Sequence, residues 1–134
     1  MFGVLDISTS ALVAQRTRLE VISSNLANKD AIYDQQGNYA PFRRRVAVLA
    51  TGDPATGRAE GVHVKRILQD RAPFRLKYDP GHPLADSAGY VRYPNINSTH
   101  EMVSAMEASR AYEANITAAE STKAMIQSTL RLLA

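Results

Sequence analysis

The residues best suited to chemistry in this sequence are three histidines and the acids near them. His82 lies between Asp79 and Asp86 in the segment "YDPGHPLADSAGYVRYPNIN". A histidine flanked by carboxylates suits a metal site or acid–base catalysis. However, neither it nor His63 or His100 has the i, i+4 histidine partner of a specific metal motif. We therefore expect His82 to be a hydrogen-bonding turn residue, and the sequence predicts no catalytic, cofactor-binding or metal-binding residue.

A second chemical feature is the positive charge between residues 31 and 98, where Arg43, Arg44 and Arg45 form the densest run. Gathered on one face of a small sheet, such residues would suit phosphate contacts. Few aromatic residues there can stack on bases, and adjacent arginines on a strand point to opposite faces. The favoured interpretation is a solvated strand face or a salt-bridged contact with an acidic neighbouring subunit. The alternative is a small basic nucleic-acid-binding protein with a helical oligomerisation region.

The composition excludes several classes of protein. The chain has 134 residues, no cysteine and a net charge of +3. Without cysteine there is no disulfide, thiolate metal site or cysteine nucleophile. No apolar run approaches the roughly 20 residues of a membrane span, and acids and arginines come too early for a cleavable signal peptide. The sequence therefore predicts a small domain that, if it is exported, uses another route.

The elements that must position these residues begin with a helix over residues 4–28. This segment has no proline and no glycine. Four leucines recur in it at intervals of seven, and an isoleucine adds a second contact row: Leu5, Leu12, Leu19, Leu26 and Ile22. Such a narrow apolar seam is typical of a coiled-coil strand and implies a partner helix. Asn25 and Asn28 tolerate the left-handed conformation and predict the end of the helix.

A longer helix is expected from about residue 99 to 132. One largely apolar stripe, with alternating steps of three and four, runs along it: Met102, Ala105, Ser109, Tyr112, Ile116, Ala119, Lys123, Ile126, Leu130 and Leu133. Ser98 followed by Glu101 fits the capping box, in which both side chains bind N–H groups of the first turn. At 1.5 Å per residue the two helices would measure roughly 35 and 50 Å. We expect their stripes to pack on each other and leave surplus surface for assembly.

Between the helices the apolar period changes to two, which predicts short antiparallel strands. The segments "APFRRRVAVLA", "GVHVK" and "FRLKY" alternate in this way, with turn residues between them, and the polar residues 29–39 are expected to form a loop. The predicted fold is α+β: long N- and C-terminal helices paired as an antiparallel coiled coil, with a small antiparallel β-rich insert. Its three parts are residues 1–28, 29–97 and 98–134.

Three segments carry motifs of a known family. The first helix ends in S-N-x-A-N, the last contains A-S-R-x-Y-x-A-N, and D-P-x-H-P-x-A-D followed by G-Y-V and P-N-x-N lies between them. Together they resemble the bacterial flagellar rod and hook axial proteins. The motif positions are Ser24, Asn25, Ala27, Asn28, Asp79, Pro80, His82, Pro83, Asp86, Gly89, Tyr90, Val91, Pro94, Asn95, Asn97, Ser109, Arg110, Tyr112 and Asn115.

The resemblance implies a structural protein rather than an enzyme. Members are exported without cleavage through the flagellar type III apparatus and polymerise around the export channel in the periplasmic space. Their terminal helices form an inner tube, the insert forms an outer layer, and the rod transmits motor torque. Short length favours the proximal rod. The partners implied are copies of itself, other rod proteins, the membrane-ring and export-gate side of the basal body and the distal rod, with no nucleic acid, cofactor or small-molecule substrate.

Overall fold

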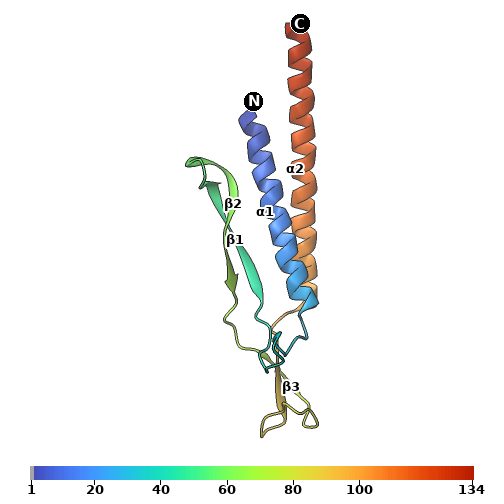
Figure 1. Ribbon diagram of the computed structural model, residues 1–134. Helices are drawn as coiled ribbons and strands as arrows, with labels where there is room; N and C mark the ends of the chain where they lie inside the picture. The colour runs from blue at the N-terminus through green and yellow to red at the C-terminus, as the bar shows by residue number, and fades with distance from the viewer. Residues whose placement is uncertain (1) are drawn as a thin grey trace.

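The chain folds as an α+β protein in which two long helices flank two β-hairpins (Figure 1). The structure is a computed structural model that describes residues 2–134. In chain order the elements are α1 (Phe2–Ala27), β1 (Arg45–Asp53), β2 (Arg58–Gln69), β3 (Arg75–Tyr78), β4 (Tyr90–Tyr93) and α2 (Ser98–Leu133). The predicted fold class, with terminal helices and small antiparallel sheets between them, is confirmed.

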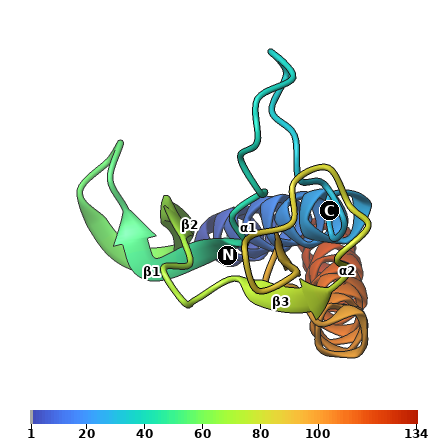
Figure 2. The ribbon, with the colours of Figure 1, turned by 90° about the horizontal axis from the view of Figure 1, so that it is seen from below.

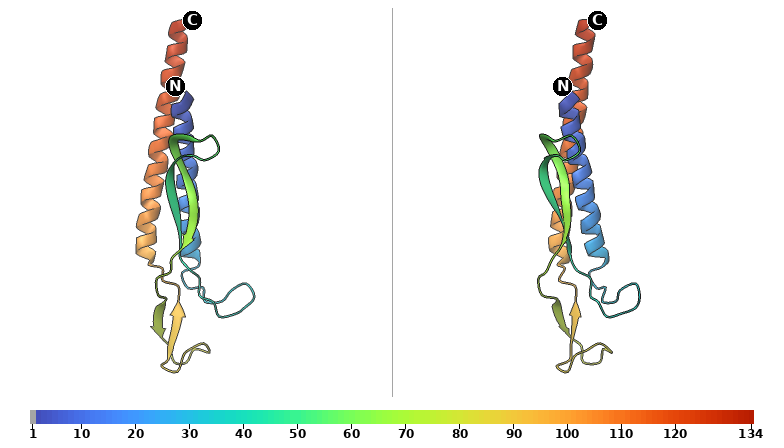
Figure 3. Two further views of the ribbon diagram at one scale, coloured as in Figure 1. Left: turned by 90° about the vertical axis from the view of Figure 1, so that its left-hand side faces the viewer. Right: turned by 60° about the vertical axis from the view of Figure 1, so that its left-hand side comes forward.

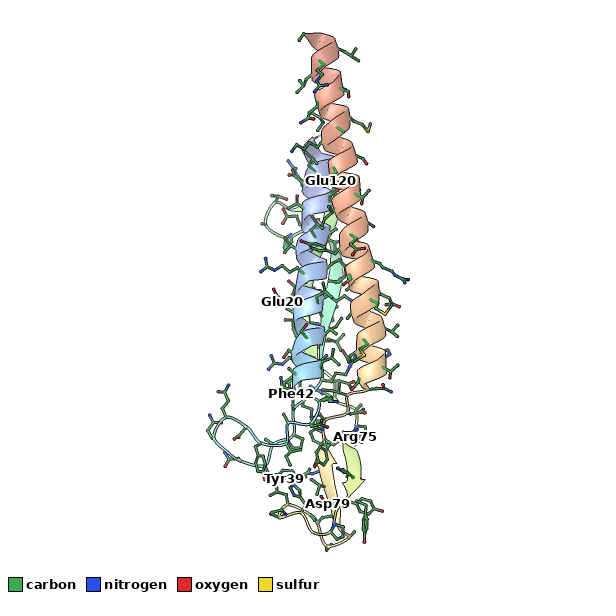
Figure 4. The ribbon with its side chains drawn as sticks, turned by 90° about the vertical axis from the view of Figure 1, so that its right-hand side faces the viewer. Glu20, Tyr39, Phe42, Arg75, Asp79 and Glu120 are labelled. Carbon is green, nitrogen blue, oxygen red and sulfur yellow. The ribbon has the colours of Figure 1, made fainter. Side chains whose placement is uncertain are left out.

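The two helices lie side by side and run in opposite directions (Figures 1 and 3). Because α1 has 26 residues and α2 has 36, α2 is longer. At 1.5 Å per residue the difference is about 15 Å. Figure 4 shows Glu120 near the N-terminal end of α1, so the last turns of α2 project past that end. Counted from the pairs Asn25–Glu101 and Arg18–Glu107, the start of α1 lies opposite about residue 124, and we call residues 125–134 the overhang. Neither helix is long and apolar enough to cross a membrane, by a search of the described residues.

Asn97, rather than Ser98, caps the start of α2. Its side-chain Oδ1 accepts the N–H groups of Thr99 at 3.0 Å and His100 at 3.2 Å, and its backbone is extended. The predicted capping box of Ser98 and Glu101 is therefore wrong. Glu101 is fully buried and bonds to other elements instead, because a charge-assisted partner inside the fold outweighs one exposed backbone N–H.

The end of α1 also differs from the prediction. Asn25 is helical, and among residues 2–134 only glycines have a positive φ, so neither Asn25 nor Asn28 is left-handed. Asn28 closes the helix in another way: its backbone N–H and its side-chain amide both donate to the Ser24 carbonyl, at 3.1 and 2.8 Å. The two donors satisfy a carbonyl that the helix itself leaves free. The chain then turns without needing a left-handed residue.

β1 and β2 form a long antiparallel hairpin along one side of α1 (Figure 2). The pairing runs from Arg45 opposite Gln69 to Asp53 opposite Arg58. The hydroxyl of Ser10 in α1 accepts the Val62 N–H at 3.1 Å. This hydrogen bond holds the hairpin against the helix. The strand predicted within "APFRRRVAVLA" exists but begins only at Arg45, because the residues before it bond to the 29–40 loop and the segment after β2.

β3 and β4 form a second hairpin that lies beyond the ends of the helices (Figures 1 and 3). Asp86 shapes its connection, since Oδ1 accepts the N–H groups of Ala88 and Tyr90, each at 2.9 Å. Tyr78 and Tyr90 meet edge to face with ring centroids 5.3 Å apart. All four side chains of β3 are exposed. A hairpin of two four-residue strands is marginal by itself in water, so its stability depends on the packing of β4 against the rest of the chain.

The apolar core lies where the helices meet the second hairpin. The buried apolar residues come from α1, the loop after it, β4, the segment before α2 and α2 itself, and they include Val21, Ile22, Ile32, Val91, Ile96 and Ala108. The predicted loop over residues 29–39 projects from the body (Figure 2). It contains one antiparallel bridge, between Tyr33 and Tyr39. The Tyr39 hydroxyl accepts the Arg92 N–H at 2.8 Å and so joins the loop to β4.

Candidate assembly surface

The candidate chemical groups are dispersed rather than convergent. His63 lies in β2, where Nδ1 is 2.7 Å from the Gly52 carbonyl oxygen. His82 lies in the turn after β3, where Nδ1 accepts the Leu84 N–H at 3.1 Å. His100 is exposed on the first turn of α2. Within residues 2–134 no group of three or more His, Cys, Asp or Glu residues is placed to hold a metal ion. The turn role expected for His82 is what the structure shows.

A hollow with a volume of about 610 Å³ lies between α1 and the β1–β2 hairpin. Three acidic residues line it, Asp6, Asp53 and Glu60, and of these Asp53 bonds to its own turn. The Asp53 carboxylate accepts the Thr56 hydroxyl at 2.7 Å and the Ala55 N–H at 2.9 Å. The Thr56 hydroxyl bond is the main cause that lowers the pKa of Asp53 below its usual 3.8. A carboxylate held ionised by its own turn is a structural acid, and it is poorly suited to proton transfer near neutral pH.

A buried polar cluster joins α1, α2 and the start of β1. Asn25 is 1% exposed and Glu101 is 0% exposed. The Asn25 side chain accepts the Arg45 N–H at 2.9 Å and donates to the Arg45 carbonyl at 2.8 Å, as a neighbouring strand would. The same amide donates to Glu101 Oε2 at 3.2 Å, and Arg44 Nε donates to Glu101 Oε1. We call Asn25, Arg44 and Glu101 the junction cluster.

The three consecutive arginines have different surroundings. Arg44 belongs to the junction cluster and also lies 3.8 Å from the Asp70 carboxylate. Arg43 donates to the Ala72 carbonyl at 2.9 Å and stacks over the Phe74 ring at 3.8 Å. Arg45 is exposed. The guanidinium of Arg45 lies over the Phe42 ring, 5.4 Å from its centre, so all three arginines make contacts within the chain. Arg45 is the most exposed of them and is the member placed to meet a neighbouring molecule.

The residues of the predicted apolar stripe of α1 are all at least half-buried. Leu5, Leu12, Leu19 and Leu26 are half-buried and Ile22 is buried. On α2, Tyr112, Ile116 and Ile126 are half-buried. The two helices also meet through Arg18 and Glu107, whose charged atoms are 3.4 Å apart.

Three members of the predicted α2 stripe are exposed instead. Met102 is 56% exposed because Glu101, one residue earlier, takes the inward position and sets the face of the first turns. Leu130 is 60% and Leu133 is 80% exposed because they lie on the overhang, beyond the end of α1. The prediction that Met102 and Leu130 pack against α1 within one chain is therefore wrong. Their role in contacts between subunits stays a prediction.

Exposed apolar side chains are unusually large and numerous for a small chain, and they lie on several elements. On α2 outside the overhang they are Met102, Val103 and Met106, and on the overhang Met125, Leu130, Leu132 and Leu133. On α1 they include Val4, Ile7 and Val13, and on the hairpins Ile67, Leu68, Leu76, Tyr78 and Tyr90. Large apolar side chains that stay exposed in the single chain are candidates for contacts between molecules. This surface is the candidate functional site.

The motif residues lie in three places, and the first is the end of α1, which holds Ser24, Asn25, Ala27 and Asn28. Those between residues 79 and 97 form the second hairpin, its turn and the entry to α2, with Val91 and Pro94 buried and Asn97 as the cap. Those in α2 lie along the helix, where Arg110 is exposed and the Asn115 amide donates to the Ala111 carbonyl at 2.7 Å. The sequence reasoning missed the junction cluster. The sequence did contain a signal for it, because polar Asn25 lies near the end of one apolar stripe and Glu101 lies at the start of the other.

Comparison with known proteins agrees with this architecture. The model of the family described as "Flagella basal body rod protein" matches residues 5–30, and "Flagellar basal body rod FlgEFG protein C-terminal" matches residues 87–132. The flagellar basal-body rod protein FlgC of Salmonella typhimurium is 44% identical over 133 residues, which cover 98% of this chain and 97% of that protein. The chain belongs to the FlgC family of flagellar basal-body rod proteins.

Other FlgC proteins from distant bacteria match over similar shares of the chain. That of Bacillus subtilis is 39% identical and that of Borreliella burgdorferi is 38% identical, with 98% and 99% of this chain covered and 97% of each relative. This FlgC family member is a structural subunit of the flagellar basal-body rod and serves motility. The nucleic-acid alternative has no support, and the relatives are structural proteins.

Proposed function

We propose that this FlgC family member is a proximal-rod subunit that polymerises through its terminal helices into a tube around the export channel. Residues 1–28 and 98–134 pair as an antiparallel coiled coil and build the inner wall, and residues 29–97 form an outer layer. The tube transmits torque, because close-packed helices along its axis resist shear. The subunit has no catalytic role and takes no cofactor, nucleic acid or small-molecule substrate.

The proposal extends to the route and the neighbours. The subunit is exported without a cleavable signal peptide through the flagellar type III apparatus and assembles in the periplasmic space. It contacts copies of itself, other rod proteins, the membrane-ring and export-gate side of the basal body and the distal rod. The family membership and the uneven charge of the insert support this reading, with exposed Arg45 available for an acidic neighbour.

The overhang is the observation that carries the proposal. Leu132 is 87% and Leu133 is 80% exposed, on a helix that has already passed the end of its partner. Full burial of one such side chain is worth about 1.5 to 3 kcal/mol. A single chain gains nothing from these leucines, whereas a neighbouring subunit that covers them gains several kcal/mol. Their exposure in one chain therefore favours assembly.

The test replaces both leucines, Leu132→Asp and Leu133→Asp, in cells that make only this variant. We expect no rods and no motility, while the purified variant unfolds at the same temperature because the leucines stabilise nothing within the chain. Immunoblots of the periplasm separate failed assembly from failed export. Ser128→Asp, an exposed site on the same overhang, is the matched control and should still give rods. Normal rods in the leucine variant would overturn the proposal.

A further inference from the structure

The apolar seam between α1 and α2 does not define its own register. Leu5, Leu12, Leu19 and Leu26 recur every seven residues, so sliding α1 by seven residues places each leucine where another was. The less exposed side of α2 combines the larger Tyr112 and Ile116 with small side chains such as Ala105, Ala108 and Ala119, and the small ones accept a leucine at several positions. A repeating apolar seam is therefore compatible with more than one axial alignment of the helices.

The junction cluster does not repeat. In the observed alignment Asn25 lies opposite Glu101 and Arg18 lies opposite Glu107. If α1 slides seven residues toward the C-terminal end of α2, Asn25 moves opposite Ala108, which has no polar side chain. Both Asn25 and Glu101, each almost wholly buried, would then lose a partner. Burying an unpartnered polar group is costly, so the slipped alignment is disfavoured although its leucines still pack.

The cluster also includes the strand. Asn25 binds both backbone groups of Arg45, and Arg44 binds Glu101, so α1, α2 and β1 meet at one point. A slip of one helix would separate Asn25 from the Arg45 backbone as well. We propose that Asn25, with Glu101 as its partner, is the residue that sets the axial register of α1 against α2. It thereby sets the length of the overhang. The proposal concerns a single chain and goes beyond the proposed assembly function.

A distance measurement tests this proposal directly. Because the chain has no cysteine, Ser23→Cys and Gln127→Cys introduce two unique and exposed sites for spin labels. The purified full-length chain should give one narrow distribution of the distance between the labels. Asn25→Leu replaces the amide by an apolar side chain that favours the helix. In this variant we expect a second population whose distance between the labels is shorter by about 10 Å, the rise of seven helical residues.

Asn115→Leu is the matched control. It makes the same replacement at a half-buried asparagine of α2 whose amide bonds only within its own helix, to Ala111. It should keep the single distance. If Asn25→Leu loses its helical circular dichroism, the double variant Asn25→Leu, Glu101→Leu replaces both buried partners and leaves Arg44 its contact with Asp70. That variant should fold and show the second population.

Four results would overturn the proposal. One is an unmodified chain without a defined distance, since there would be no register to set. Another is a folded Asn25→Leu or double variant that keeps the single original distance. A third is a second population in the Asn115→Leu control, because any seam asparagine would then suffice. The last is loss of folding in both cluster variants. The cluster would then stabilise the fold in general rather than select one alignment of α1 against α2.

Discussion

The side-chain amide of Asn25 donates to Glu101 Oε2 at 3.2 Å, and this bond links the last turn of α1 to the first turn of α2. The two residues are 76 positions apart in the sequence. Both are almost wholly buried, and Arg44 brings the positive charge that the buried carboxylate requires. The hydrogen bond therefore marks the place where the two ends of the chain are joined to the insert.

Removing this carboxylate should destabilise the fold strongly. Glu101→Ala leaves both Asn25 and Arg44 without their shared acceptor. Breaking a buried pair from one side costs about 3 to 5 kcal/mol, and we expect the lower figure because the Arg44 side chain keeps 21% exposure to water. Urea unfolding followed by circular dichroism measures this free energy. Glu107→Ala provides the control, since its pair with Arg18 is exposed and should lose less than about 1 kcal/mol. Equal losses would contradict the importance assigned to the junction cluster.

The second hairpin should not tolerate a side chain at Gly89. This glycine has φ 84°, and a Cβ there would lie 2.9 Å from Tyr78 Cε2 and 3.1 Å from Pro80 Cβ. Gly89→Ala should therefore cost more than the roughly 1 to 2 kcal/mol of a left-handed alanine alone. Gly37→Ala isolates that backbone cost, because Gly37 has φ 82° and open space around it. Thermal unfolding of the two variants compares them, and equal losses would show that Tyr78 and Pro80 yield without cost.

A charge in the helix seam should block rod assembly. Ile116 is half-buried in α2, and Ile116→Asp places a carboxylate between helices, where its desolvation is unfavourable. We expect no rods in electron micrographs of basal bodies and no swimming. Thr117→Asp puts the same group on the neighbouring, exposed position and should leave both readouts normal. Intact rods in the Ile116 variant would count against the seam.

Charge reversal should separate the roles of two adjacent arginines. Arg45→Glu alters an exposed side chain, so the chain should unfold at nearly the same temperature while rod assembly falls if an acidic neighbour is bound. Arg44→Glu places a carboxylate beside Glu101 and Asp70 and should unfold the chain at a lower temperature. Thermal unfolding and counts of rods give the two readouts. Unchanged assembly of the Arg45 variant would reject the contact with an acidic neighbour.

The tip of the first hairpin should loosen only in acid. The Thr56 hydroxyl and the Ala55 N–H hold the pKa of Asp53 below its usual 3.8, so the ionised form is bound more tightly in the folded chain. The resulting stabilisation is present above pH 3.8 and is lost as the pH falls through the lower folded value. The amide resonance of Ala55 should report this change. In Asp53→Asn, which keeps an acceptor oxygen but cannot ionise, the acid transition should disappear; its persistence would assign the transition to another group.

The sequence allowed the periodic parts of the structure to be predicted. Leucines every seven residues gave α1, and alternation gave β1, β2 and β3, since such patterns directly express which side chains face inward. The features that failed depend on contacts between distant segments. Asn97 rather than Ser98 became the cap because Glu101 was needed by Asn25 and Arg44. A capping motif is local, and it could not reveal a partner 57 residues away in the chain.

The face of α2 illustrates the same limit for the candidate site. By residue type Met102 fits an apolar stripe and Glu101 does not, yet Glu101 is buried and Met102 is 56% exposed. Only the contacts of Glu101 with distant residues reveal which of the two faces inward. Leu130 and Leu133 are exposed because α2 is ten residues longer than α1 and its last turns have no partner helix. The predicted helix boundaries already implied this difference in length.

The unequal helices also bear on how a tube of these subunits would break. With α2 extending about 15 Å further than α1, the two helix ends of a subunit lie at different heights. If neighbouring subunits fill the space left by this difference in height, a plane across the tube at the end of one helix passes through the middle of another helix. A transverse crack would then have to sever covalent backbone or change direction at every subunit, and bending would not concentrate on a single ring of contacts.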